Sequence, residues 1–320
     1  MEKMIINLPS VRDDKNGYVY LIKLVNQVLN NPRKHFDINF RNCAILEQNA
    51  VAILGGLAQY INTQNTLFNK ALGGVMIPQY GVMFLVDTMS EIISNNLIEN
   101  NFLAHFSQEK FSGYPSGSYI GYRQHTDYLD ADEIAFHLDN EWLSSEKIKL
   151  SNDLKSAIVS RIFEIFMNAY GHGADQKPVS GLGVMSCGQY NKKEGKLKLT
   201  VLDFGEGIVQ TVKTHVDSKF SDIEAMEWAL IAGNSTRTDS QGVNLPRGLG
   251  FELLSDFVSL NKGSFSVYSN GCCAYVNEEG RYEVSLLKTP LNGTMVNISI
   301  NCDDRYYKFI AEDDELGFFF

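Results

Sequence analysis

The segment "KLKLTVLDFGEGI", residues 196–208, predicts a β-strand that runs into a glycine turn. Helices are predicted around it, because apolar residues recur at helical intervals in "DLKSAIVSRIFEIFMNAYGHG" (153–173), "IEAMEWALIAG" (223–233) and "LGFELLSDFVSLNKG" (249–263). Strand-like segments follow over residues 264–269, 272–277, 281–287 and 293–300. The C-terminal half is therefore predicted to combine helices with an antiparallel sheet.

The N-terminal half shows a different order, in which strands and helices alternate. Residues 4–8 and 35–40 are strand-like, and each segment is followed by an amphipathic helical pattern, over 17–31 and 46–64. Further on, "GGVMI" (73–77) predicts another strand, and residues 80–106 predict a helix. This alternation favours an α/β layer.

Length and composition indicate two globular domains. The chain has 320 residues, whereas a single hydrophobic core usually stops growing at about 250 to 300. The content of 44% hydrophobic and 21% charged residues is typical of globular proteins. Because residues 112–128 are rich in Gly, Ser and Tyr, we expect a first domain over 1–110, a linker over 111–144 and a second domain over 145–320.

Charge and cysteine usage limit the partners and the compartment. The net charge of -10 argues against a nucleic-acid partner. The five cysteines are scattered and lack the CxxC spacing of zinc sites, which favours a reducing compartment. The N-terminal segment "MEKMIINLPS" has no apolar core of signal-peptide length, and no stretch approaches the roughly 18 apolar residues of a membrane span. We expect a soluble, cytoplasmic protein without a membrane partner.

The helix predicted over 153–173 carries polar residues on a face that is otherwise apolar. Glu164, Asn168 and His172 are spaced four residues apart, so an α-helix brings them to one side. An unpaired polar group in a core costs about 1 to 3 kcal/mol. Either local partners or a ligand must therefore satisfy these side chains.

Three glycine-containing segments accompany this helix: "DFGEG" (203–207), "RGLGF" (247–251) and "NGT" (292–294). Taken singly, each is most often only a turn. Together they suggest a nucleotide site, because an acid at a strand end can accept a hydrogen bond from an exocyclic amine and glycines at a helix start expose N–H groups to phosphate. The Asn168 oxygen suits Mg²⁺, and Glu164 could deprotonate a water or a hydroxyl.

In their order and spacing these four motifs resemble the N box and the glycine boxes of the GHKL superfamily, which includes gyrase, histidine kinases, anti-sigma-factor serine kinases, heat-shock chaperones and mismatch-repair ATPases. The resemblance covers residues 145–300. It implies an α/β sandwich, in which a mixed sheet is covered on one face by helices and ATP is held under a polar lid.

The resemblance also implies roles for individual residues. Glu164 would be the general base and Asn168 the Mg²⁺ ligand. The residues that would contact ATP are Asp203 and Thr294 near the adenine, Gly205 and Gly207 at the floor of the pocket, and Gly248 and Gly250 near the phosphates.

Some features depart from the family or stay open. Phe251 stands where many members have an aliphatic residue, and no phosphoacceptor helix of the histidine-kinase type is present. His172 could approach the phosphates or simply cap the helix end. Arg237 and Arg247 could clamp the phosphates or be solvated. The tail "DDELGFFF" could dock into a partner or pack on its own domain.

The N-terminal half resembles a STAS-type module over residues 1–110, on the basis of the strand "FDINF" and the helix after it. In anti-anti-sigma proteins of that type a phosphorylatable serine lies at the start of this helix. This chain has Glu47, Gln48 and Asn49 there, so a docking role is expected rather than a phosphoswitch.

We therefore expect an ATP·Mg²⁺-binding regulatory protein that acts as a slow ATPase or as a serine/threonine kinase, with nucleotide-controlled binding of a signalling or sigma-regulatory protein. The alternative is an interaction module that binds nucleotide without chemistry. Retention of Glu164 favours chemistry, because a binder needs no general base. The oligomeric state stays open, with a homo-oligomer as one alternative.

Overall fold

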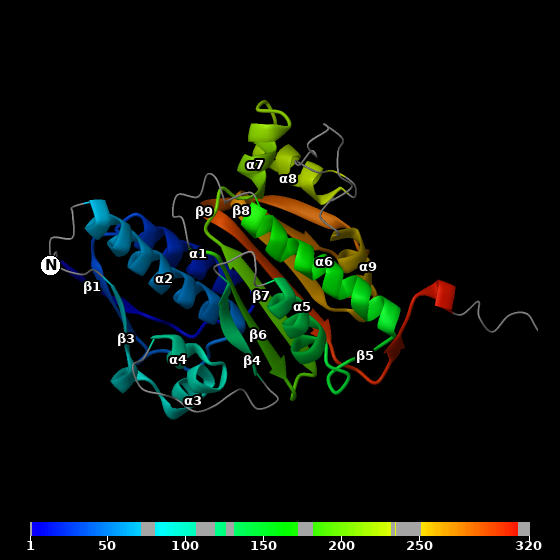
Figure 1. Cartoon of the computed structure of the whole chain (residues 1–320), viewed down its shortest axis with the longest axis horizontal. Helices are drawn as coiled ribbons and strands as arrows, with labels where there is room; N and C mark the ends of the chain where they lie inside the picture. The colour runs from blue at the N-terminus through cyan, green and yellow to red at the C-terminus, as the bar shows by residue number, and fades with distance from the viewer. Residues whose placement is uncertain are drawn as a thin grey trace, which may run out of the picture.

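The two larger β-sheets of the described residues are a parallel one in the N-terminal half and an antiparallel one in the C-terminal half (Figure 1). The computed structural model describes residues 2–71, 81–106, 119–125, 131–171, 182–231, 234 and 251–312. The protein is a mixed α/β protein, which confirms the predicted class.

The parallel sheet has the strand order β1-β2-β3. Its strands are β1 (Lys3–Asn7), β2 (His35–Asn39) and β3 (Val82–Leu85), and they are linked through α1 (Lys15–Leu29) and α2 (Gln48–Ala71). Helix α1 begins after Asp14, whose side chain accepts a hydrogen bond from the backbone N–H of Gly17 at 2.8 Å. This cap satisfies one of the unpaired N–H groups of the first turn.

The helix predicted over residues 80–106 is wrong in its first part. Its N-terminal end forms β3, followed by the 3₁₀ turn η1 (Val86–Thr88), and only then come α3 (Glu91–Glu99) and α4 (Phe102–Phe106). The segment "VMFL" pairs with β2, and Ser90 caps the helix by accepting from the Ile93 N–H. The strand predicted over residues 73–77 lies outside the described residues.

The second sheet has five strands in the order β4-β6-β7-β9-β8. They are β4 (Tyr119–His125), β6 (Val184–Asn191), β7 (Lys196–Asp203), β8 (Ser264–Val276) and β9 (Tyr282–Asn301). All four pairings in the described part of this sheet are antiparallel, so the expectation of a mixed sheet is wrong here. Consecutive hairpins join β6 to β7 and β8 to β9, and a hairpin can only make antiparallel neighbours.

The four strands expected between residues 264 and 300 are two long ones. Strand β8 continues through an irregularity near Asn270, where φ is +50°, and β9 continues through residues 288–292, which separate the last two expected segments. The sequence breaks at these points are bends within strands, which is a known role for positive-φ residues and glycine.

The helices of the C-terminal half are α5 (Ala131–Phe136), the π-helical turn η3 (His137–Trp142), α6 (Asn152–Gly171), α7 (Ile208–His215), α8 (Asp222–Leu230) and α9 (Phe251–Asn261). A short parallel pair joins β5 (Lys149–Leu150) to β10 (Tyr306–Tyr307). Part of the expected linker is therefore structured, because β4 pairs with β6, and α5 and η3 place Ile134 and Trp142 in a core.

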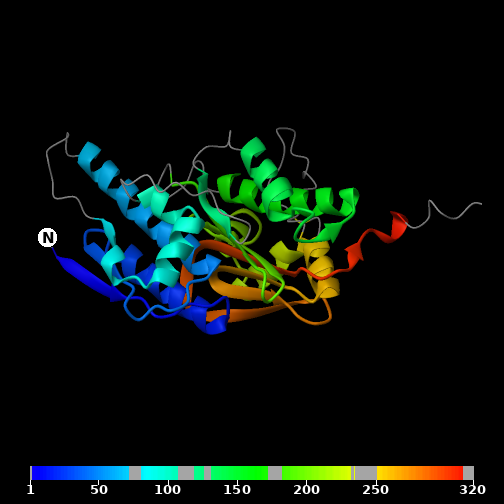
Figure 2. The ribbon, with the colours of Figure 1, turned by 90° about the horizontal axis from the view of Figure 1, so that it is seen from below.

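The five-stranded sheet separates two hydrophobic cores. Along β7, Leu199 and Val201 join the core formed with α6 and α9, whereas Leu202 joins the core of the N-terminal half. Successive side chains of a strand point to opposite faces, so the two cores lie on opposite sides of the sheet. The C-terminal helices cover one face as expected, and α1 and α2 contact the strands from the other half of the molecule (Figures 1 and 2).

Among the described residues, none of the helices combines the length and the hydropathy that crossing a bilayer requires.

Candidate functional site

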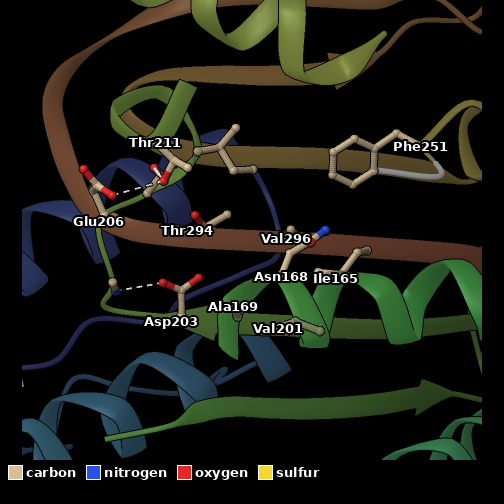
Figure 3. A pocket seen from close by; sticks show the side chains of 13 residues that line it. Ile165, Asn168, Ala169, Val201, Asp203, Glu206, Thr211, Phe251, Thr294 and Val296 are labelled. Carbon is tan, nitrogen blue, oxygen red and sulfur yellow. Dashed lines mark hydrogen bonds between the residues drawn. The ribbon is translucent and has the colours of Figure 1, made fainter. Parts of the chain in front are cut away.

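A cavity lies where α6, β7, α7, α9 and β9 meet (Figure 3). Its volume is about 520 Å³, including space open to solvent. Five residues predicted for the nucleotide site line it: Asn168, Asp203, Gly205, Gly207 and Thr294. Segments that are far apart in the sequence are thus brought to one place.

Asp203 and Thr294 form the polar end of the cavity. They are direct register partners, Asp203 at the end of β7 and Thr294 within β9, and they are only 8% and 9% exposed. The Oδ1 atom of Asp203 accepts a hydrogen bond from the Gly205 N–H at 2.7 Å. This bond fixes the carboxylate within the turn that follows the strand.

Strand β8 holds this turn from the other side. The Ser269 hydroxyl accepts from the Ile208 N–H at 2.7 Å and donates to the Gly293 carbonyl at 3.0 Å. Gly207 has φ +84°, and a Cβ there would overlap the Asn270 side chain. Gly293 has φ +114°, and a Cβ there would lie 2.0 Å from the Asp203 carbonyl oxygen. Both positions therefore require glycine.

The remaining walls are largely apolar. Their apolar side chains include Ile165, Val201, Ile208, Phe251 and Val296. The Phe251 ring lies 5.3 Å from the Phe265 ring, and the Tyr282 hydroxyl donates to the Phe251 carbonyl at 2.7 Å. Burial raises the pKa of Tyr282, which keeps this hydroxyl protonated as a donor. Such walls suit a flat, apolar-faced ligand that carries a few polar groups.

Asn168 reaches the cavity from α6 and offers an amide oxygen. Among the described residues its side chain has no hydrogen-bond partner, which leaves it available to a ligand. Mg²⁺ is commonly bound by one or two protein oxygens together with waters and substrate phosphates. In the described part of the chain no group of three or more His, Cys, Asp or Glu side chains could hold a metal by itself. The residues present thus fit a metal ion that arrives with a phosphate ligand.

Glu164 lies one turn before Asn168 but does not line the cavity. Its Oε1 atom forms an ion pair with Arg161 at 2.6 Å, and its side chain is 27% exposed. The structure therefore separates the predicted base from the other five residues. Arg247, Gly248, Gly250, His172, Arg237 and the tail over residues 313–320 lie outside the described residues.

Sequence reasoning missed two polar residues of the cavity, Glu206 and Thr211. The Glu206 carboxylate accepts from the Thr214 hydroxyl at 3.1 Å and from the Thr211 hydroxyl at 3.5 Å. Glu206 belongs to the "DFGEG" motif itself, so its proximity could have been predicted. Thr211 could not, because α7 was not predicted.

The chain was compared with protein-family models and with curated proteins, and neither comparison found a match.

Proposed function

We propose that the cavity binds ATP as its Mg²⁺ complex, in the manner of the GHKL superfamily that the motifs resemble. The observation that carries this proposal is the convergence of Asn168, Asp203, two glycines of "DFGEG" and Thr294 on one cavity with apolar walls. These residues come from segments that are far apart in the sequence, and a common ligand would explain why they line one cavity.

The polar end of the cavity, formed by Asp203 and Thr294, is suited to the adenine ring of ATP. Asp203 accepts a hydrogen bond from the exocyclic amine, and Val201, Val296 and Ile165 contact the faces of the ring. Asn168 would supply an oxygen to the metal, which in turn neutralises phosphate charge. The same proposal includes the fold family of the two halves, a GHKL-type sandwich joined to a STAS-like half.

Chemistry requires Glu164 to act as a general base. It would take a proton from a water, giving a slow ATPase, or from a serine or threonine hydroxyl of a partner protein, giving a kinase. A second candidate function, nucleotide binding without chemistry, is favoured by one observation: Glu164 is paired with Arg161 and does not line the cavity. In either case we propose a cytoplasmic protein that changes its contact with a protein partner when nucleotide binds.

Titration calorimetry with ATP and Mg²⁺ tests the binding site. Asp203→Asn should weaken ATP binding about tenfold or more, because the amine loses a charged acceptor. Asp217→Asn is the matched control, since Asp217 is an exposed carboxylate outside the cavity. An Asp203→Asn protein that binds ATP as tightly as the wild type would refute the assignment.

Phosphate release and phosphotransfer decide between the two candidates. Glu164→Ala should bind ATP normally and lose about a hundredfold or more of any turnover if Glu164 is the base. If Glu164→Ala turns over ATP as fast as the wild type, or if the wild type shows no turnover, the enzyme candidate is excluded and the nucleotide-binding module remains.

A further inference from the structure

The turn that carries Asp203 is also in contact with the N-terminal half. Phe204 follows Asp203 directly, is buried, and belongs to the core of the N-terminal half. Its ring meets the Tyr60 ring of α2 edge to face, with the centroids 6.1 Å apart. Asp203 thus lines the cavity, while its neighbour contacts α2 on the opposite side of the sheet.

Gly56 lets α2 approach this turn closely. A Cβ at this position would lie 3.0 Å from the Phe204 ring, 3.0 Å from Leu202 and 2.9 Å from Met185. The helix therefore packs its backbone against Phe204 one turn before Tyr60. Any displacement of α2 at this point acts on Phe204.

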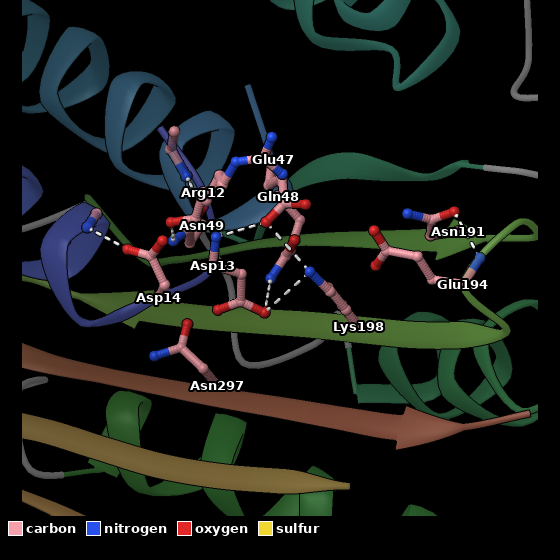
Figure 4. A network of polar contacts seen from close by, with 12 residues as sticks. Arg12, Asp13, Asp14, Glu47, Gln48, Asn49, Asn191, Glu194, Lys198 and Asn297 are labelled. Atoms are coloured by element: carbon pink, nitrogen blue, oxygen red, sulfur yellow. Dashed lines mark hydrogen bonds and ion pairs between the residues drawn. The ribbon is translucent and has the colours of Figure 1, made fainter. Parts of the chain in front are cut away.

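The start of α2 is tied to the same strand by an ionic cluster (Figure 4). The buried Lys198 ammonium of β7 lies 3.1 Å from Glu47 and 3.5 Å from Asp13, and the Gln48 amide donates to Asp13 at 3.0 Å. From Glu47 to Tyr60 a helix rises about 20 Å, which equals the length of about 20 Å that a strand covers from Lys198 to Phe204. Helix α2 is therefore attached to β7 at both ends of a matched span.

We propose that Tyr60 and Gly56 are positioning residues for Asp203 and act through Phe204. The inference rests on the proposed function, because it concerns the carboxylate that would accept the amine of ATP. Because Asp203 and Phe204 are adjacent in the chain, the contact of Phe204 with α2 holds the backbone of the turn and thus the direction in which the Asp203 Cβ projects, while the Gly205 N–H orients the carboxylate itself. The N-terminal half thereby controls recognition of the adenine ring. A partner protein that shifts α2 would change the affinity for the nucleotide.

The test compares ATP with purine riboside triphosphate, which lacks the exocyclic amine. Dissociation constants for both are measured for the full chain by titration calorimetry in the presence of Mg²⁺. The wild type should prefer ATP. Tyr60→Leu should reduce this preference about fivefold, the effect of one hydrogen bond, and leave the affinity for the analogue unchanged.

Three further variants distinguish positioning from general packing. Tyr60→Phe keeps the ring and should restore the preference. Tyr20→Leu makes the same substitution at a half-buried tyrosine of α1, beside Cys43, and should have no effect. Gly56→Ala pushes on Phe204 without removing a side chain, so it should also reduce the preference and provides the test if Tyr60→Leu fails to fold.

The outcomes separate the two proposals. A wild type that binds neither triphosphate overturns the proposed function, and the positioning role with it. A wild type that prefers ATP, with the same preference in Tyr60→Leu and Gly56→Ala, overturns the positioning role alone. Equal loss of affinity for both ligands would also overturn it, because that result indicates general damage to the cavity.

Discussion

Strands β7 and β9 present two faces of opposite character at neighbouring positions. Leu199 lies opposite Ile298 and packs under α6 and α9, whereas the next pair, Thr200 and Asn297, faces the N-terminal half. Thr200 donates to Asn297 at 2.7 Å, and nearby Lys198 is buried between two carboxylates. The face toward α6 and α9 is stabilised by apolar burial. The face toward the N-terminal half is stabilised in addition by hydrogen bonds and ion pairs between buried polar groups.

The two faces differ more in which surface they can pack against than in how much each contributes to the stability of the fold. An apolar face tolerates partners of about the right size, because hydrophobic burial has no direction. A buried ammonium accepts only a partner that brings negative charge to it. The polar face can thus fix how the N-terminal half sits on the sheet, at some cost in stability.

The largest expected effect comes from breaking the charge balance of the polar face. Lys198→Met should lower the free energy of unfolding by about 3 to 5 kcal/mol, because Asp13 and Glu47 stay buried without their cation. Urea denaturation followed by circular dichroism measures this change.

The matched control removes all three charges together. Asp13→Asn, Glu47→Gln and Lys198→Met in one chain should recover most of the loss, because no uncompensated charge remains. If Lys198→Met alone is as stable as the wild type, the cluster is not a buried ionic contact.

A smaller effect is expected from changing neighbouring pairs on the two faces. Thr200→Val leaves the buried Asn297 oxygen without its donor and should cost about 1 to 3 kcal/mol. Ile298→Val removes one methylene from the apolar face and should cost about 0.5 to 1.5 kcal/mol. Thr214→Val, at an exposed hydroxyl, should change stability by less than about 0.5 kcal/mol. A cost for Thr200→Val below that of Ile298→Val would contradict the difference between the faces.

The smallest effect concerns an ionisable group beside the apolar core. His137 is buried, its Nδ1 atom lies 2.7 Å from Glu141, and burial lowers its pKa although Glu141 opposes this shift. A folded-state pKa below the unfolded value of 6.5 means that the unfolded chain binds the proton more readily. Stability should therefore fall on acidification, by no more than about 0.7 kcal/mol between pH 7 and pH 6.

Chemical denaturation at pH 7 and pH 6 gives the change in the free energy of unfolding for each variant. The contribution of His137 is the difference between the change in the wild type and the change in His137→Gln. His137→Gln should lose this part of the pH dependence, and His215→Gln, at an exposed site, should retain it. Equal pH dependence in His137→Gln and the wild type would show that the imidazole does not titrate as expected.

Much of the architecture followed from local patterns. The alternation of "HFDINF" and the glycine turn of "DFGEG" predicted strands that exist, and apolar spacing predicted α1, α2, α6, α8 and α9. Asp203, Gly205, Gly207, Asn168 and Thr294 were selected from motifs, and all five line one cavity. Motifs were informative where the backbone itself forms the site.

What could not be predicted depends on contacts between distant segments. "VMFL" before α3 continues a helical pattern, and only pairing with β2 makes it a strand. The packing of Tyr60 on Phe204 joins residues of the two halves, and no local pattern indicates it. Glu164 fits the spacing of the motif, but the helix period also places Arg161 three residues before it, and the sequence does not show which of the two, Arg161 or a ligand, its carboxylate meets.

Strand β9 has a consequence for the synthesis of the chain. It is the last strand of the five-stranded sheet in the sequence, yet it lies between β7 and β8 and contributes Thr294 and Val296 to the cavity. During translation α6 and β7 emerge first and wait for this central strand, because long-range pairing completes late. We therefore expect a ribosome-bound chain that lacks β9 to lack the cavity as well, so that the cavity forms only when the sheet is complete.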